Sequence, residues 1–498
     1  MIRDIDSFAE KELSIPVVTL MERSGEAIAN AVKQVSGAGG RVFVLCGCGN
    51  NGGDGYAAAL KLNDLYKVTV FDVFGMGQKS ESGKYWRTEY IKRRGKLLYG
   101  IPSKQKISRG ADVIVDAIFG TGFHGQVPAE LISLARFVNS KRAIKVIAAD
   151  IPLGVCADDG TAREFALKCD VTVSLSFPKL AMFSYPAKEC VGEVIIDRLG
   201  LDEDVIGDRF EFNDHYVDRA LARKLLPPRA KNTNKGSFGK ALLVVGSNEF
   251  MGASALALEA ALRGGAGYVT FLGKESLCDF LLNKFPEAIY KRTDFADSGN
   301  VLACCERQNS ILIGSGSGCT KALYTTVKAL VDSEGGPIII DADAINAIAK
   351  YGSAEILREA KRKVILTPHP LEFSRISGAS VEYIQANRYR AAKDFAKKYN
   401  CVVLLKGAAT LVTDGFTTYV NGSGSSALAK AGSGDVLAGL LVSILAYSDS
   451  SVKSAALAAY IHGKAGDLLA KEFSHYGVTP SDLPKMMTKI MAEMEMNG

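Results

Sequence analysis

The sequence of 498 residues is poor in features that mark several classes of protein. Its ten cysteines include no C-x-x-C pair with a partner pair, so a disulfide framework or a zinc site of that type is not expected, and reduced thiols are the simpler interpretation. The apolar segment VLAGLLVSILAY (436–447) is too short to span a bilayer, and the N-terminus MIRDIDSFAEKEL lacks the apolar core of a signal peptide. We therefore expect a cytoplasmic protein with no membrane partner.

The net charge is also small, and the chain has a single tryptophan. A formal charge of +6 is small for this length and argues against a dedicated nucleic-acid-binding protein. Trp86, the single tryptophan, has no aromatic cluster around it that would serve as a base-stacking platform. Arginine and lysine residues cluster within residues 219–240, and we interpret them as a solvated linker surface. No nucleic-acid partner is expected.

Apolar strand-like runs alternate with helix-like segments in both halves of the chain. Near-continuous apolar runs are typical of parallel strands that are covered on both faces. The length predicts two domains, and the alternation predicts that both are doubly wound α/β domains. The expected strands are 41–47, 67–74, 111–120, 143–150 and 171–177 in the first half, and 240–247, 267–273, 310–316, 337–344, 363–369 and 401–407 in the second.

The alternation stops between residues 201 and 240, which contain a Pro-Pro pair and few strand-like residues. We place the boundary near 205–215, which gives domains of residues 1–210 and 211–498. Two long helices are expected to close the second domain, one from about Gly434 and one from about Val452.

A glycine-rich segment, CGCGNNGGDGYAAAL, follows the first strand, at the usual phosphate position of a Rossmann-like unit. Its glycines allow tight, positive-φ turns and close approach of a ligand to the backbone, although a plain Asn/Asp/Gly turn is the alternative interpretation. Two further strand ends carry Asp116 before FGTGFHGQ and Asp150 before Ile-Pro-Leu-Gly. Because ligands lie beyond the carboxyl ends of strands in such sheets, the three segments together predict a binding site.

Five blocks in the first 205 residues resemble the NAD(P)H-hydrate epimerase domain: TLMERSG (19–25), GNNGGDG (49–55), DAIFGTG (116–122), D-I-P (150–152) and FPKLAMFSYPAKECVGEVIIDRLG (177–200). That family interconverts the R and S forms of hydrated NADH or NADPH and holds a potassium ion. The resemblance implies that Asp150 is the acid/base and that Asn51 and Asp116 ligate K⁺ through oxygen. It implies substrate binding by Asn50, Asn51, Gly52, Gly53, Asp54, Gly120, Thr121, Gly122, Phe123, His124, Gly125 and Gln126. The family's usual D-I-P-S-G departs here to Leu153, which removes a side-chain oxygen.

In the second half, AKAGSGDVLAG (429–439) places Gly432 and Gly434 at the start of an apolar helix. These glycines leave backbone amides open to hold phosphate oxygens. Asp435 would then take a proton from a hydroxyl that is driven toward a terminal phosphate. The alternative is an aspartate that only caps the helix, worth about 1 kcal/mol. Polar groups at neighbouring strand ends favour the base: Gly314, Gly316, Gly318, His369, Lys406 and Gly407.

This half resembles the ribokinase-like superfamily and, within it, the ADP/ATP-dependent NAD(P)H-hydrate dehydratase. The resemblance implies that Lys406, Gly407, Ala408, Ala409, Thr410 and Gly434 bind the adenine nucleotide. It implies that Ala253, Gly316 or Gly318, His369 and Asp435 face the hydrated nicotinamide nucleotide. The blocks are NKGSFGKALLVVGS (234–247), DADAINAIA (341–349), LTPHPLEF (366–373), LKGAATLVTDG (405–415), NGSGSSALAKAGSGDVLAG (421–439), HGKAGDLLA (462–470) and GVTPSDL (477–483).

Together the two resemblances imply a bifunctional repair enzyme. It would epimerise hydrated NADH and NADPH and dehydrate the S form at the expense of ADP, with Mg²⁺ for the phosphates and K⁺ in the first domain. We expect a homo-oligomer. The alternative is a ribokinase-like small-molecule kinase whose first domain binds without catalysis. The family's H-P-G-E departs here to Leu371, which would move the His369 loop if that position needed a positive φ.

Overall fold

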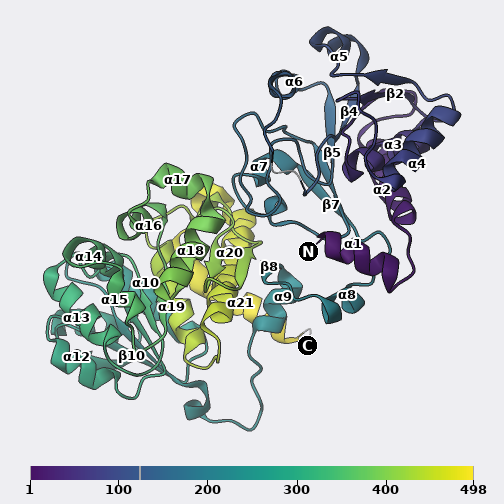
Figure 1. Ribbon diagram of the computed structural model, residues 1–498. Helices are drawn as coiled ribbons and strands as arrows, with labels where there is room; N and C mark the ends of the chain where they lie inside the picture. The colour runs from purple at the N-terminus through teal and green to yellow at the C-terminus, as the bar shows by residue number, and fades with distance from the viewer. Residues whose placement is uncertain (1, 123–124, 497–498) are drawn as a thin grey trace. The chain divides into compact units, whose positions relative to one another are not determined.

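The computed structural model describes residues 2–122 and 125–496, so the expected binding residues Phe123 and His124 lie outside the described residues (Figure 1). The chain divides into two compact units, Met1–Phe212 and Asn213–Gly498. Each unit has its own sheet and its own core.

A seven-stranded sheet forms the centre of the first unit. Its strands are β1 (Arg41–Cys46), β2 (Lys67–Asp72), β3 (Leu97–Tyr99), β4 (Val113–Ala117), β5 (Lys145–Ala149), β6 (Val171–Leu175) and β7 (Glu193–Asp197). Every neighbouring pair is parallel, in the order β3-β2-β1-β4-β5-β6-β7. The helices are α1 (Ile2–Lys11), α2 (Val17–Val35), α3 (Asn50–Leu62), α4 (Glu81–Lys92), α5 (Lys104–Gly110), α6 (Ala129–Asn139), α7 (Lys188–Val191) and α8 (Glu203–Arg209).

Residues of β1 alternate between two hydrophobic cores. Val42 and Val44 pack with α2 and α3, whereas Phe43 and Leu45 pack with α5 and α6. Because both faces of the sheet are covered, its strands are apolar along most of their length, which is why the sequence revealed them. The doubly wound prediction is confirmed.

The second unit contains a ten-stranded mixed sheet in the order β11-β10-β9-β12-β13-β14-β15-β16-β17-β8. Its strands are β8 (Asp214–Val217), β9 (Lys240–Val244), β10 (Tyr268–Gly273), β11 (Ile289–Arg292), β12 (Ser310–Ile313), β13 (Ile338–Ile340), β14 (Val364–Leu366), β15 (Val402–Leu405), β16 (Leu411–Thr413) and β17 (Thr418–Asn421). The pairs β15–β16 and β16–β17 are antiparallel, and the others are parallel.

Helices cover both faces of this sheet as well. Leu312 faces the core that contains α10, α19, α20 and α21, while Ile311 and Ile313 point to the opposite face and are also fully buried. The helices are α9 (Arg219–Leu225), α10 (Met251–Arg263), α11 (Glu275–Leu282), α12 (Ser298–Cys305), α13 (Lys321–Val331), α14 (Asp343–Tyr351), α15 (Glu355–Arg358), α16 (Pro370–Ser377), α17 (Val381–Ala386), α18 (Arg388–Tyr399), α19 (Ser433–Leu445), α20 (Ser451–Gly477) and α21 (Leu483–Met496). The two long helices expected from about Gly434 and Val452 are α19 and α20.

The glycine-rich segment after β1 differs from the expected loop. Helix α3 begins at Asn50, so the polar residues up to Asp54 form its first turn, and none of the glycines from 47 to 55 has a positive φ. Glycine is needed at positions 52 and 55 because a larger residue would not fit. A Cβ on Gly55 would lie 2.7 Å from the Cβ of Ala117, and a Cβ on Gly52 would lie 1.9 Å from the oxygen of Gly47. The glycines therefore let α3 pack closely on the sheet.

Candidate functional site

A cavity of about 660 Å³ opens beyond the carboxyl ends of β1, β4, β5 and β6 in the first unit. The predicted acid/base Asp150 lines it together with seven of the residues predicted to bind substrate: Asn50, Asn51, Asp54, Gly120, Thr121, Gly122 and Gln126. Gly52, Gly53 and Gly125 are not among its lining residues. Gly53 instead lies against Met21, whose sulfur would be 2.5 Å from an added Cβ.

Asn51 offers an unused ligand atom in this cavity. Its Nδ2 donates to the carbonyl of Phe119 at 2.9 Å, while its Oδ1 is buried and has no hydrogen-bond partner among the described residues. Buried acceptors are normally satisfied, so an orphaned amide oxygen indicates a missing donor or cation. A hard cation such as K⁺ fits such an oxygen.

Asp116, the second expected K⁺ ligand, is fully buried and does not line the cavity. Its Oδ1 accepts the Ile118 N–H at 3.2 Å and its Oδ2 accepts the Leu153 N–H at 2.7 Å. Burial raises the pKa of the Asp116 carboxyl to about 6, although these two hydrogen bonds oppose the shift. Each carboxyl oxygen therefore already fixes a loop amide.

Leu153 enters this arrangement only through its backbone. Its side chain is 2% exposed and packs in the core with Leu45 and Leu131. Position 153 therefore offers no side-chain oxygen in place of the one that the family's serine provides.

Asp150 lies at the end of β5 with a φ of 70°, an unusual backbone conformation for a non-glycine residue. Its Oδ1 accepts a short hydrogen bond from the ammonium of Lys179, which also donates to the carbonyl of Leu175 at 2.6 Å. Both side chains are largely buried. The lysine therefore fixes the carboxylate in the strained position that faces the cavity.

Two more carboxyl groups surround this ion pair. Burial, followed by the charge of Asp150, raises the pKa of Asp54 well above its ordinary value. Burial likewise raises the pKa of Asp6, from α1, to about 6, and Lys179 opposes that shift. Asp6 also lines the cavity. The first unit thus holds one lysine among three carboxyls, and burial favours the neutral form of Asp54.

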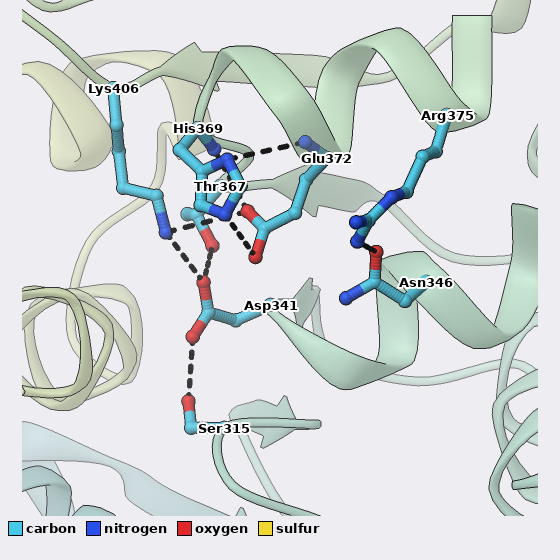
Figure 2. A network of polar contacts seen from close by, with 8 residues as sticks. All are labelled: Ser315, Asp341, Asn346, Thr367, His369, Glu372, Arg375 and Lys406. Atoms are coloured by element: carbon cyan, nitrogen blue, oxygen red, sulfur yellow. Dashed lines mark hydrogen bonds and ion pairs between the residues drawn. The ribbon is translucent and has the colours of Figure 1, made fainter. Parts of the chain in front are cut away.

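In the second unit, Asp341 organises a buried polar network after β13 (Figure 2). Its Oδ2 accepts the Ser315 hydroxyl at 2.7 Å, and its Oδ1 accepts the Thr367 hydroxyl at 2.7 Å and the Lys406 ammonium at 3.2 Å. The ammonium is also 3.8 Å from Glu372 Oε2. Burial alone would lower the pKa of Lys406, but Asp341 and Glu372 outweigh it and raise the pKa.

His369 caps the start of α16 in the same network. Its Nδ1 accepts the Glu372 N–H at 3.2 Å, its backbone N–H donates to Glu372 Oε2 at 2.8 Å, and its Nε2 lies 3.2 Å from Glu372 Oε1 (Figure 2). Leu371 lies inside α16 without a positive φ, and its side chain is 47% exposed. The leucine therefore replaces the family's glycine without backbone strain.

Asp435 lies in the first turn of α19, after Gly432 with a φ of 97°. Burial raises its pKa to about 7, helped by Asp341, while Lys406 opposes the shift. Lys406 Nζ would be 3.5 Å from a Cβ on Gly434, so the ammonium lies against this turn. The structure thus brings Asp435, Gly434 and Lys406 together, and gives Asp435 the pKa of a proton acceptor that works near pH 7.

The remaining predicted residues lie in helix α10, in the loop after β12 and in the loop after β15. Gly316 and Gly318 have φ of 62° and 79°, and Ala253 and Phe250 crowd Gly316, where an added Cβ would be 2.7 Å from the Cβ of Ala253. Gly318 N–H donates to Asp343 Oδ2 at 2.8 Å. Residues 406–410 form the loop between β15 and β16, in which the Thr410 hydroxyl donates to the Gly407 carbonyl at 3.0 Å.

Sequence reasoning missed Asp6, Lys179 and Asp341. Asp341 directly follows a buried strand, the same signal that identified Asp116 and Asp150. Lys179 lies inside one of the quoted blocks, but nothing local shows that it reaches Asp150 across 29 positions.

Two features are absent from the described ranges, 2–122 and 125–496. No group of three or more His, Cys, Asp or Glu side chains there could hold a metal ion. No helix within them is long and apolar enough to cross a membrane.

Each of the two units contains a segment that matches a known protein family. Residues 241–489 match the family described as NAD(P)H-hydrate dehydratase, and residues 17–181 match the family described as YjeF-related protein N-terminus. A bifunctional NAD(P)H-hydrate repair enzyme of Thermofilum pendens is 31% identical over 98% of this chain and 95% of its own length. Another from Coxiella burnetii is 32% identical over 97% and 96%. A solved ADP/ATP-dependent NAD(P)H-hydrate dehydratase of Bacillus subtilis, co-crystallised with ATP and Mg²⁺, aligns with a TM-score of 0.52 at 29% identity over 57% of this chain and all of its own. The chain therefore belongs to the family of bifunctional NAD(P)H-hydrate repair enzymes.

Proposed function

We propose that this protein repairs hydrated NADH and NADPH. The first unit interconverts the R and S forms, and the second dehydrates the S form at the expense of ADP. The observation that carries the dehydratase assignment is Asp435, a half-buried carboxyl at the start of α19 whose pKa of about 7 suits a base at neutral pH. Fusion has a chemical purpose, because epimerisation supplies the dehydratase with the form that it accepts.

In the dehydratase, Asp435 takes the proton of the ring hydroxyl while the hydroxyl oxygen bonds to the terminal phosphorus of ADP and AMP leaves. The phosphate then leaves with the C–O bond electrons, and the neighbouring ring carbon loses a proton to water, which restores the double bond. Positioning of the substrate falls to Ala253, Gly316, Gly318 and His369. The free amides of Gly407, Ala408 and Ala409 and the first turn of α19 at Gly434 receive the nucleotide, with Thr410 closing the loop.

In the epimerase, Asp150 acts as the acid/base beside the ring, oriented by Lys179. Its strained backbone is the kind of feature that concentrates at active sites. The nucleotide lies against Asn50, the first turn of α3 and Gly120 to Gln126.

Two cations belong to this proposal. Asn51 Oδ1 is available for K⁺, and Asp116 would reach the ion only through lone pairs that the two backbone amides leave free. The ion would offset negative charge on the bound nucleotide. Mg²⁺ would arrive on the phosphates of ADP, which suits a cation that is commonly held by substrate phosphates and water.

Two lesser expectations accompany the proposal. All ten cysteines are free, which supports a reducing compartment such as the cytoplasm. A homo-oligomer stays a prediction. The kinase alternative has less support, because the curated relatives span both units under one repair-enzyme name.

The decisive experiment incubates the full-length protein with hydrated NADH, ADP and Mg²⁺ and follows the return of nicotinamide absorbance together with AMP and phosphate. We expect all three products in equal amounts. A stable phosphorylated product without recovery of NADH would instead identify a kinase. R-to-S exchange, measured by chromatography with and without K⁺, tests the first unit separately.

A further inference from the structure

Arg388 is a buried cation beneath the loop of residues 406–410. It begins α18, and the residue is 3% exposed. Its Nη2 donates to the carbonyls of Leu405 at 3.1 Å and Lys406 at 3.3 Å, and its Nη1 donates to Gln385 Oε1 at 3.0 Å. The guanidinium lies flat against Gly407, because a Cβ there would be 3.0 Å from both Nη1 and Nη2.

No carboxylate within residues 2–122 and 125–496 pairs with this guanidinium. Burial lowers the pKa of Arg388 to about 10, and no acidic side chain contributes to the shift. Its Nε is buried without a partner among the described residues. A buried cation that lacks a carboxylate and also has an unsatisfied N–H is costly, so its position beneath an exposed loop favours an anion bound at that loop.

The loop above the guanidinium is arranged to accept such an anion. Gly407 and Ala409 have φ of 140° and 49°, and Gly407 and Ala408 are exposed. The backbone N–H groups from Gly407 to Ala409 make no hydrogen bond within the part of the chain that the structure describes. Since Arg388 holds the preceding carbonyls inward, the amides are left free on the outer side, as in anion-binding nests.

Lys406, the other cation at this loop, already has carboxylate partners. Its ammonium already lies between Asp341 and Glu372. The cation that remains uncompensated at this loop is therefore Arg388.

We propose that Arg388 is a positioning residue whose charge, acting through the loop amides of residues 407–409, selects phosphorylated over neutral adenine ligands. This inference rests on the proposed use of ADP by the second unit. The guanidinium touches the loop rather than the nucleotide, so the effect concerns affinity for phosphate and leaves the proton transfer at Asp435 unchanged.

Arg362 provides a matched control. It is also buried, at 7% exposed, and is paired with no carboxylate of the described residues, but every one of its guanidinium nitrogens donates to the Ser333–Gly336 segment just before β13. It precedes β14 and so lies at the amino end of that strand, whereas the loop follows the carboxyl end of the adjacent parallel strand β15. A purely structural buried arginine is thus available in the same unit.

The test measures Kd of ADP and of adenosine by calorimetry, with adenosine in competition, on full-length wild type, Arg388→Met, Arg388→Lys and Arg362→Met. In Arg388→Met we expect the preference for ADP over adenosine to fall about tenfold or more, and KM for ADP to rise with kcat changed less than about threefold. Arg388→Lys keeps the charge and should retain most of the preference. Arg362→Met should lower Tm and leave the preference unchanged.

Equal losses for ADP and adenosine in Arg388→Met, or an unchanged preference, would overturn the proposal. If Arg388→Met does not fold, a wild-type preference in Arg388→Lys supports the proposal and a lost preference contradicts it. Wild-type protein that fails to bind ADP would instead refute the proposed function, so the two failures are distinguishable.

Discussion

The ammonium of Lys406 lies 3.2 Å from Asp341 Oδ1 and 3.8 Å from Glu372 Oε2, between the two carboxylates. Its positive charge also lowers the pKa of Asp435, against burial and Asp341, which raise it. The lysine thereby couples the buried network to the proposed base, and it decides the pH range in which that base works.

The pH dependence of dehydration follows from this coupling. Asp435 accepts a proton only when ionised, so kcat should fall as pH drops through about 7 and reach a plateau above it. Lys406→Met removes a charge that favours the carboxylate, so the midpoint should move to higher pH. Initial rates with saturating ADP from pH 5 to 9 provide the measurement. A midpoint that stays in place or moves to lower pH would contradict the coupling.

Asp435→Asn tests the base directly. The amide keeps the size of the side chain but cannot accept the hydroxyl proton, so the rate should fall about 100-fold or more. Kd for ADP, measured by calorimetry, should change less than about threefold, because the α19 amides remain. Asp332→Asn, at an exposed ion pair with Lys328, is the matched control and should keep the wild-type rate. Full turnover of Asp435→Asn would show that another group is the base.

The sequence predicted the central strands well and the peripheral ones poorly, for a physical reason. Buried strands such as β12 and β15 are continuous apolar runs, whereas the edge strand β11, IYKR, is partly exposed and charged. The short antiparallel strands β16 and β17 are not among the expected strands although both are buried, since their sequences, LVT and TYVN, include polar residues. Apolar composition reports burial, so strands at the edge of a sheet escape it.

The same limit applies to the candidate site. Asp150, His369 and Asp435 could be identified because each follows a strand or opens a helix. Lys179 and Arg388 could not, because their partners, Asp150 and Gly407, are brought to them by the fold and carry no local signal. The composition of the segment likewise did not indicate that the glycines near Gly52 allow close helix packing rather than turns.

The role of Asn51 predicts the behaviour of the first unit in potassium salts. K⁺ should raise Tm of the wild-type protein relative to choline, and Asn51→Ala should abolish that increase along with the K⁺ dependence of epimerisation. Loss of the bond to Phe119 adds about 1 kcal/mol of destabilisation in either salt, so the comparison is between salts. An undiminished K⁺ response in the variant would remove Asn51 from the site.

Leu153→Ser asks whether the family's serine can be restored. The side chain at this position is in the core, so the change should cost about 2–4 kcal/mol of unfolding free energy in denaturant titrations. The K⁺ response should not increase, because position 153 contributes its N–H to Asp116 rather than a side-chain ligand. Tighter K⁺ binding by this variant would mean that the loop can turn the residue outward.

The Asp150–Lys179 ion pair should reveal itself in a double-mutant cycle. Lys179→Met leaves a buried carboxylate without its partner and should destabilise the first unit by about 3 kcal/mol or more, and Asp150→Asn leaves a buried ammonium with a similar cost. The double variant should be more stable than the sum of the two losses predicts, yet all three should lose epimerase activity. Additive losses of stability would mean that the two groups do not interact.

The buried His462 should make the second unit sensitive to acid. Burial lowers its pKa from 6.5 to about 4, against a hydrogen bond with the Ser433 backbone, and its Nε2 has no partner among the described residues. A folded pKa below the unfolded one means that the unfolded chain binds the proton more tightly. The stabilising contribution is therefore complete above pH 6.5 and is lost as pH falls toward 4, about 3 kcal/mol in all.

Asp435 titrates with the opposite sign in the same window, because its folded pKa is raised, so the informative quantity is the difference between variant and wild type. His462→Leu removes the titrating group and fills the same apolar surroundings. We expect its unfolding free energy, relative to wild type, to rise steadily between pH 6.5 and 4 in urea titrations. A difference that does not change with pH would show that the imidazole takes up a proton as readily in the folded protein as in the unfolded chain, and hence is solvated or paired there.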